Sequence, residues 1–248
     1  MATFILIHGA WHGSWCWEHV VPLLEAQGHR VLAPDLPGMG NDHTPLNTIT
    51  LDKWARFVAD LVRQQNEKVI LVGHSRGGVV ISQAAEYAAD HIQGLIYLAA
   101  FLIPNGETLW GTLQQHPRDP NRPSDLVFSS DHSTSTITEA AVRDTFYNTT
   151  LDVWQKRAAS LVGPEPMVSF VTPLVLTEEN FGRVPRVYIE SLQDRAIPIT
   201  LQRSMVSALP CRQVETLDTD HSSFYSAPEL LVAQLLELNK FLESLSRH

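Results

Sequence analysis

One stretch of ten residues, 69–78, constrains the fold of this chain more than any other. An apolar run, V-I-L-V, is followed by G-H-S-R-G-G and then by the helix-forming segment 79–86. This order is typical of a buried strand that turns sharply into a helix. Gly73 and Gly77 lack the Cβ atoms that would collide in so tight a turn, so Ser75 can adopt a sparsely populated backbone conformation. The pattern predicts a serine hydroxyl presented to a cleft; a Gly-rich turn with a helix cap is the simpler alternative.

Strands and helices alternate on both sides of this turn. Apolar runs are predicted as strands at residues 4–7, 29–33, 68–72, 92–100, 186–190 and 212–217. Amphipathic segments are predicted as helices at residues 14–27, 50–65, 75–86, 198–209 and 228–245. Such alternation favours an α/β fold, with a mostly parallel central sheet flanked by helices on both faces.

Regularity is lost between residues 102 and 183. Polar residues at 131–138 separate helical pieces at 139–146 and 151–161. Prolines interrupt the segment at Pro104, Pro117, Pro120, Pro123, Pro164, Pro166 and Pro173. We interpret it as a mainly helical cap without a sheet, inserted into a core of residues 1–101 and 184–248, where it covers the strand ends and excludes water. Its aromatic side chains either line the underside of the cap or form its own small core: Trp110, Phe146, Tyr147 and Trp154.

Two further candidates for a catalytic site each come just after a predicted strand. Asp194 and His221 follow Ser75 in the order serine, acid, histidine of one known class of catalytic triad. A neutral imidazole would accept the serine proton, and the carboxylate would hold the tautomer of the imidazole. The rival acids are Glu190, Asp218 and Asp220. The first lies within a strand, and the other two are too close to the histidine in sequence. Asp35, in a turn, and His74 are expected to be structural.

The loop H-G-A-W-H-G at residues 8–13 is a second functional candidate. Its glycines let the backbone turn away from the strand, so that N–H groups near Ala10 can point into a cleft. N–H groups at the start of the helix after Ser75 would join them in stabilising negative charge on a bound carbonyl oxygen. An ordinary strand-to-helix connection is the alternative. His8 and His12 have no nearby carboxylate or cysteine in the loop, so we expect no metal site.

Composition excludes several classes of function. The 248 residues carry a net charge of −9, which argues against nucleic acid as a partner, and no apolar run is long enough to span a membrane. The chain enters its first apolar run at once, without the pattern of a signal peptide, so we expect a cytoplasmic protein. Cys16 and Cys211 lie far apart without metal-ligand spacing and are predicted to be buried free thiols.

Five motifs give the chain its resemblance to a known family. They are F-I-L-I-H-G-A-W-H-G at 4–13, A-P-D-L-P-G-M-G at 33–40, V-G-H-S-R-G-G at 72–78, Q-D-R-A-I-P at 193–198 and D-H-S-S-F at 220–224. Over nearly its whole length the chain resembles the α/β-hydrolase superfamily, and within it the plant methylesterase and hydroxynitrile lyase branch with its bacterial esterase relatives. The resemblance implies Ser75 as nucleophile, His221 as base, Asp194 as its orienting acid, and the N–H groups of Ala10 and Arg76 as oxyanion donors.

Departures from the lyase members bear on the reaction. Those enzymes have Thr or Asn after the first histidine of the loop motif, and the type with Thr also uses a Lys after the catalytic histidine; here the positions hold Gly9 and Ser222. Cyanohydrin cleavage must manage a cyanide leaving group, whereas ester hydrolysis needs room for an acyl group and water, which glycine provides. Arg76 replaces the small or apolar residue common after the nucleophile, and the sequence leaves open whether it enters the pocket or forms a surface pair.

Together these observations predict a cofactor-independent serine hydrolase that cleaves a small, fairly apolar ester, lactone or carbamate through an acyl-enzyme on Ser75. A hydroxynitrile lyase is the alternative enzyme, and a hydrolase-like receptor for a small molecule is the alternative from another class. The substrate-pocket candidates are Gly9, Trp11, Phe101, Trp110, Phe146, Trp154 and Ser222. The oligomeric state stays open, a homodimer included.

Overall fold

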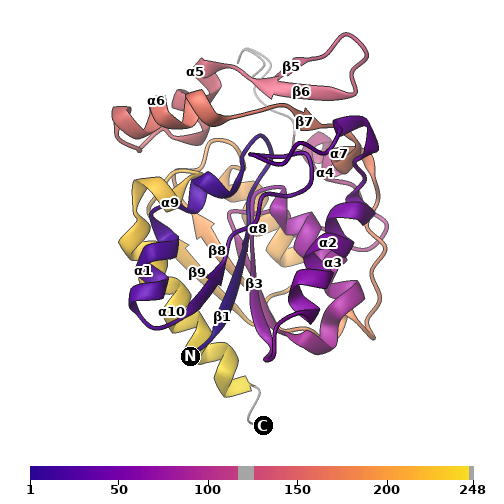
Figure 1. The fold of residues 1–248 in the computed structure, drawn as a ribbon, viewed down its shortest axis with the longest axis vertical. Helices are drawn as coiled ribbons and strands as arrows, with labels where there is room; N and C mark the ends of the chain where they lie inside the picture. The colour runs from indigo at the N-terminus through magenta and orange to yellow at the C-terminus, as the bar shows by residue number, and fades with distance from the viewer. Residues whose placement is uncertain (117–125, 246–248) are drawn as a thin grey trace.

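A six-stranded sheet forms the centre of the molecule (Figure 1). The computed structural model describes residues 1–116 and 126–245, and within them the strand order is β2-β1-β3-β4-β8-β9, with all neighbouring pairs parallel. The strands are β1 (Thr3–Ile7), β2 (Arg30–Leu32), β3 (Val69–His74), β4 (Ile92–Leu98), β8 (Arg186–Ser191) and β9 (Gln213–Leu217). The prediction of a mostly parallel sheet is confirmed.

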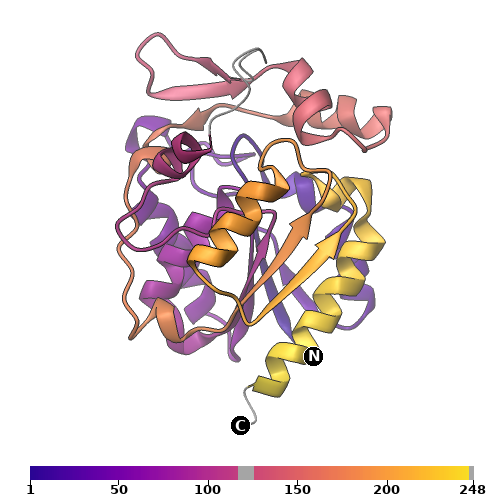
Figure 2. The same cartoon turned by 180° about the vertical axis from the view of Figure 1, so that it is seen from behind.

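Helices cover both faces of this sheet, as predicted. Figure 1 shows α1 and α10 on one side and α2 and α3 on the other, and Figure 2 shows the same layers from behind. The main helices of the core are α1 (Val20–Ala26), α2 (Leu51–Arg63), α3 (Gly77–Ala88), α8 (Ile199–Ala208) and α10 (Pro228–Leu245). Thr50 caps α2, because its hydroxyl accepts a hydrogen bond from the N–H of Lys53 (3.0 Å).

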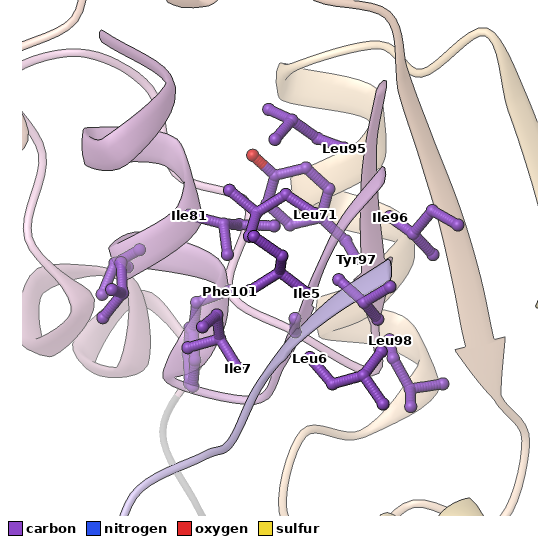
Figure 3. Packing of buried hydrophobic residues seen from close by; sticks show 14 of the residues in the cluster. Ile5, Leu6, Ile7, Leu71, Ile81, Leu95, Ile96, Tyr97, Leu98 and Phe101 are labelled. Carbon is purple, nitrogen blue, oxygen red and sulfur yellow. The ribbon is translucent and has the colours of Figure 1, made fainter. Parts of the chain in front are cut away.

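The core is apolar because the strands are covered on both sides. Every residue of β3 is buried, which explains its unbroken apolar run. Figure 3 shows Ile81 of α3 beside Leu71 and Tyr97 of the sheet, all of them fully buried. This packing holds the ends of the strands, and the loops that follow them, in fixed positions.

Some local predictions for the core were wrong. The segment 14–27 forms two pieces, a 3-10 helix η1 (Ser14–Trp17) and α1, instead of one continuous helix. The N–H of Ser14 donates to Oδ1 of Asp35 (2.5 Å), whose Oδ2 accepts from the N–H of Asn41 (3.0 Å). Asp35 is therefore structural, as expected, because its carboxylate links two loops. A short helix, α9 (Ser223–Ser226), was not predicted, and the remaining 3-10 turns are η2 (Leu46–Thr48), η3 (Ala89–His91) and η5 (Phe181–Arg183).

Of the segment 102–183, residues 109–116 and 126–171 lie across one end of the sheet (Figures 1 and 2). Residues 172–183 run back along α3, where the hydroxyl of Thr177 donates to Glu86 (2.7 Å). The helices of the segment are α4 (Leu109–Gln115), α5 (Glu139–Ala141), the π-helical turn η4 (Val142–Phe146), α6 (Asp152–Leu161) and α7 (Val168–Val171). It also contains an antiparallel sheet of three strands, β5 (Leu126–Phe128), β6 (Thr134–Ile137) and β7 (Glu165–Pro166).

The expectation that this segment, the cap, has no sheet was therefore wrong. Strand β6 comes from the polar run 131–138, which the sequence analysis placed between two helical pieces. Along it Ser135 and Ile137 are buried and Thr136 is exposed, so the run has the two-residue period of a strand. Three prolines of the cap lie outside the described residues: Pro117, Pro120 and Pro123.

Candidate active site

Ser75 lies at the tip of β3, in the sharp turn that the sequence predicted. Its φ is +55°, a left-handed conformation that is unusual for a residue with a side chain, and α3 begins two residues later at Gly77. A Cβ atom on Gly73 would lie 2.8 Å from the carbonyl oxygen of Gly77, and one on Gly77 would lie 2.8 Å from that of Ile7. Both glycines are thus required by close backbone contacts, and Ser75 is held where strand and helix meet.

His221 and Asp194 are brought together from the loops after β9 and β8. Nδ1 of the histidine lies 2.7 Å from Oδ2 of the aspartate, and both side chains are fully buried. Oδ1 of Asp194 accepts hydrogen bonds from the N–H groups of Ala196 and Ile197 (2.8 Å each), which fixes the carboxylate. Within the described residues, Nε2 of His221 is buried and has no hydrogen-bond partner. This arrangement leaves one ring nitrogen available as a base.

The rival acids are engaged elsewhere. Glu190 pairs with Arg203 (2.7 Å), and Asp218 accepts a hydrogen bond from the side chain of Gln193 (2.9 Å). Asp220 reaches the cap, where Oδ2 accepts from the hydroxyl of Thr150 (2.9 Å). These contacts leave Asp194 as the acid bonded to His221.

Two histidines of the loop 8–13 lie near the site, and both of their rings are hydrogen-bonded at both nitrogens. Nδ1 of His8 donates to the carbonyl of Gly9 (2.9 Å) while its Nε2 accepts from the N–H of Leu36 (3.1 Å). Nδ1 of His12 donates to the carbonyl of Ala10 (2.7 Å), and its Nε2 bonds the Tyr147 hydroxyl (2.6 Å). Burial lowers the pKa of His8 to about 3 and that of His12 to about 4. With both nitrogens of each ring occupied, these side chains serve as packing and hydrogen-bonding groups.

His74 packs directly against the candidate base. Its Nε2 donates to the carbonyl of His221 (2.9 Å), and the two ring centroids are 4.5 Å apart. Burial, followed by the charge of His221, holds the pKa of His74 well below the usual range of histidine. The expected packing role of His74 agrees with this geometry.

The loop 8–13 runs beside the nucleophile. A Cβ on Gly9 would lie 2.9 Å from Cβ of Ser75 and 3.0 Å from Nδ1 of His74, so glycine is the residue that fits there. In the described part of the chain, the N–H groups of Ala10 and Arg76 donate to no acceptor. Both amides are thus free to bind an oxygen of a ligand.

The side chain of Arg76 neither enters a pocket nor reaches the surface. Its Nε lies 2.9 Å from Oε1 of Glu165 in the cap, and the two side chains are 1% and 0% exposed. The guanidinium also lies over the ring of Trp54, 4.2 Å from its centroid. Sequence reasoning missed Glu165; a buried arginine after the nucleophile indicates that an acid must pair with it, but nothing in the sequence identifies which one.

The structure brings only some of the predicted pocket residues to the site. The ring of Phe146 is 5.4 Å from that of His221 and 5.7 Å from that of Trp11. The N–H of Phe101 donates to the carbonyl of Ser75 (3.0 Å), and Ser222 follows the histidine and is fully buried.

Trp154 and Trp110, which were also predicted to line the pocket, lie away from the triad. The ring of Trp154 packs on His19 (4.5 Å) and Tyr225 (5.8 Å), and within the described residues it makes no ring contact with His221. Trp110 is 37% exposed on α4 and makes no ring contact with the site within the described residues.

The sharp turn at Ser75, the acid after β8 and the histidine after β9 are the features of an α/β-hydrolase. The model of the alpha/beta hydrolase family matches residues 4–234, and the chain belongs to this family. It is 35% identical over 251 residues to a pyrethroid hydrolase of Sphingobium wenxiniae, covering 96% of this chain and 87% of that protein. It is 31% identical over 249 residues to an alpha-hydroxynitrile lyase of Arabidopsis thaliana, covering 94% and 95%.

Solved structures give the same result. A methylesterase from Arabidopsis, MES16, superposes with a TM-score of 0.82 at 30% identity over 97% of this chain and 100% of that one. A pyrethroid hydrolase from Sphingobium faniae superposes with a TM-score of 0.85 at 32% identity over 100% and 99%. The chain spans only 56% to 63% of the length of the chloroplastic methylesterases 11, 13 and 15 of Arabidopsis thaliana. In the parts of the chain that the structure describes, no helix has the length and apolar character needed to cross a membrane.

Proposed function

We propose that this protein is a serine hydrolase that cleaves carboxylic esters through an acyl-enzyme on Ser75. The observation that carries the proposal is the 2.7 Å bond between His221 and Asp194, which leaves Nε2 of a buried imidazole without a partner in the described residues. The similarity to methylesterases and pyrethroid hydrolases supports ester hydrolysis as the reaction.

The proposed reaction has two steps. Nε2 of His221 accepts the proton of the Ser75 hydroxyl, the oxygen attacks the ester carbonyl, and the alcohol leaves with that proton. Asp194 stabilises the imidazolium formed during attack. The N–H groups of Ala10 and Arg76 bind the oxyanion. In the second step His221 activates a water, which releases the acid and restores the serine.

The surroundings of the site favour a small, fairly apolar substrate. Phe146 is buried beside His221 and packs on the buried ring of Trp11, and Phe101 is buried with its N–H bonded to the carbonyl of Ser75. Aromatic side chains of this kind bind acyl or alcohol groups mainly by removing apolar surface from water. Lactones and carbamates of similar size share the carbonyl chemistry and belong to the proposed substrate class.

The similarity to a hydroxynitrile lyase makes cyanohydrin cleavage the second candidate. Gly9 and Ser222 favour hydrolysis over it: the first places no side chain beside Ser75, and the second is buried and carries no charge for a cyanide leaving group. A receptor that binds a small molecule without turnover is the candidate from another class.

One assay distinguishes the three candidates. Kinetics are measured with p-nitrophenyl esters of increasing acyl length and with mandelonitrile, for the parent and for Ser75→Ala. We expect ester turnover with a preference for short acyl chains, no cleavage of mandelonitrile, and loss of turnover in the variant. Efficient release of cyanide by the parent would establish the lyase, and binding of esters without turnover would establish the receptor.

We also propose a cytoplasmic location. Both cysteines are free thiols, Cys16 buried and Cys211 half-buried, as suits a reducing compartment. Fractionation of the native host, with immunodetection of the protein, tests the proposal, and recovery from an exported fraction would contradict it.

A further inference from the structure

The ion pair between Arg76 and Glu165 lies where the core meets the cap. Arg76 follows the candidate nucleophile, and Glu165 belongs to β7; their side chains are 1% and 0% exposed. Removing two charges from water costs about as much as their attraction returns, so a buried pair of this kind is weak evidence for stability. Its hydrogen bonds indicate a role in the site.

Arg76 holds the peptide group between Gly9 and Ala10. The carbonyl oxygen of Gly9 accepts hydrogen bonds from Nη2 of Arg76 (3.1 Å) and from Nδ1 of His8 (2.9 Å). In a planar trans peptide the N–H points opposite to the C=O, and the N–H of this peptide is that of Ala10. By holding the carbonyl, Arg76 sets the direction in which the proposed oxyanion donor points.

Glu165 holds the next peptide group. Its Oε2 accepts a hydrogen bond from the N–H of Trp11 (3.2 Å), while the carbonyl of Ala10 accepts from Nδ1 of His12 (2.7 Å). Trp11 has a φ of +63°, in the left-handed region that side chains disfavour, so this turn depends on its contacts. The two peptide groups flanking Ala10 are therefore both fixed by the ion pair.

We propose that Arg76 and Glu165 are positioning residues for the oxyanion hole: they hold the N–H of Ala10 toward the substrate carbonyl and make this orientation depend on the seating of the cap. The inference rests on the proposed function and deepens it. Arginine suits the task because its planar fork reaches Glu165 and the Gly9 carbonyl at once, which a lysine ammonium does not.

The test removes both charges together, because a single loss would leave a buried charge without its partner. For Arg76→Met/Glu165→Leu and the parent, kcat and KM are measured with a p-nitrophenyl ester. Inhibition is measured with a trifluoromethyl ketone, which forms a tetrahedral adduct on serine, and with the matching methyl ketone, which binds as a ground state. We expect kcat to fall about 10–100-fold with KM within about 3-fold, which is below the loss from deleting an oxyanion donor outright.

The two ketones separate positioning from general damage. In the double variant the affinity for the trifluoromethyl ketone should fall in proportion to kcat/KM. The affinity for the methyl ketone should stay within about 2-fold, since only the tetrahedral adduct uses the Ala10 N–H. Arg76→Lys should give a loss of kcat between those of the parent and the double variant. If the double variant does not fold, the affinities for the two ketones are compared in Arg76→Lys instead. An equal loss of affinity for both ketones, or a kcat/KM in the double variant equal to that of the parent, would overturn the inference.

A matched control is available in a second pair that also joins cap and core. Nε and Nη2 of Arg157 each lie 2.6 Å from the carboxylate of Glu18, and within the described residues this pair has no bond to the loop 8–13. Arg157→Met should keep kcat and both ketone affinities within about 2-fold, and a loss as large as that of the double variant would contradict the inference. Retained ester turnover in Ser75→Ala would overturn the proposed function itself, which distinguishes the two failures.

Discussion

The core and the cap differ in how completely their sheets are buried. In the core, β1, β3 and β4 bury apolar side chains on both faces of the sheet. In the cap, the small sheet leaves Val127 and Phe128 52% and 38% exposed. The cap meets the core through aromatic packing, such as Phe146 on Trp11 and Tyr147 on His12. It also meets the core through polar contacts, which include Arg76–Glu165, Trp11–Glu165, Thr150–Asp220, Asn148–Gln193 and Arg157–Glu18.

This difference indicates that the two regions have different roles in the site. Burial of apolar area is strong and does not depend on direction, so it fixes the loops that carry Ser75, Asp194 and His221. Hydrogen bonds and ion pairs are directional, and a few of them set how the cap meets those loops. Substitutions at the contacts between the cap and the loop 8–13 should therefore change catalysis more than stability, and removal of apolar side chains buried in the sheet should do the reverse.

The largest expected effect is the loss of the nucleophile. Ser75→Ala removes the attacking oxygen, so ester turnover should fall about 10⁴-fold or more. The core packing is unchanged by the loss of one hydroxyl, and the unfolding midpoint should stay within a few degrees of the parent. Turnover near the parental level would show that this turn is not the catalytic one.

The next effect is expected where the core loop meets the nucleophile. In Gly9→Thr the new Cβ would lie 2.9 Å from Cβ of Ser75, so the side chain crowds the space needed by the acyl group and the deacylating water. Ester turnover should fall about 10–10³-fold, less than for Ser75→Ala, because the oxyanion amides remain. Mandelonitrile cleavage should stay absent or weak, since Ser222 offers no positive charge. Parental ester kinetics in this variant would mean that Gly9 does not border the acyl site.

Acid should weaken the core through its buried histidines. The pKa values of His8 and His12, about 3 and about 4, lie below the usual value near 6.5, so between these limits the unfolded chain binds protons that the folded protein does not. Each neutral histidine therefore contributes fully to the free energy of unfolding above pH 6.5. Below pH 6.5 this contribution falls by about 1.4 kcal/mol per pH unit for each histidine, until its folded pKa is reached.

Urea unfolding at pH 7.5 and pH 5 measures this loss, which should be about 2 kcal/mol per histidine. His12→Asn keeps a donor for the carbonyl of Ala10 but does not titrate, so its stability should depend less steeply on pH than that of the parent. Equal pH dependence in the two proteins would contradict the assignment of a buried neutral histidine.

The smallest effect is expected at an exposed contact between cap and core. In the pair Arg157–Glu18 the side chains are 43% and 29% exposed, so solvent screens their attraction. Arg157→Met should lower the free energy of unfolding by about 0–1 kcal/mol. A loss above about 2 kcal/mol in urea unfolding would show that the cap contributes more to stability than its polar contacts suggest.

Much of the core could be predicted from the sequence because its signals are local. An apolar run identifies β3 wherever the strand lies in the sheet, and Gly73 and Gly77 mark the turn by the space that they leave. Asp194 and His221 were predictable as neighbours because loops after parallel strands gather at one edge of a sheet. Their 2.7 Å separation agrees with that reasoning.

The cap was less predictable because its signals depend on distant partners. Strand β6 is polar and becomes a strand only by pairing with β5 and β7. Glu165 is 89 residues from Arg76, and the intervening chain must fold before the two can meet. Trp154 was predicted as a pocket residue because it is aromatic. It packs on Tyr225 because of the position that α6 takes on the core, and no periodicity in the sequence specifies that position.

The central claim, an acyl-enzyme on Ser75, is tested most directly by mapping the covalent adduct. The protein is treated with a p-nitrophenyl alkylphosphonate, which phosphonylates an activated serine and releases p-nitrophenol, and the digested protein is sequenced by mass spectrometry. The account predicts one phosphonyl group per chain, on Ser75, with loss of ester turnover in proportion to labelling and no label in Ser75→Ala. Full inactivation with the label on another residue, or ester turnover that persists when Ser75 is completely labelled, would contradict it.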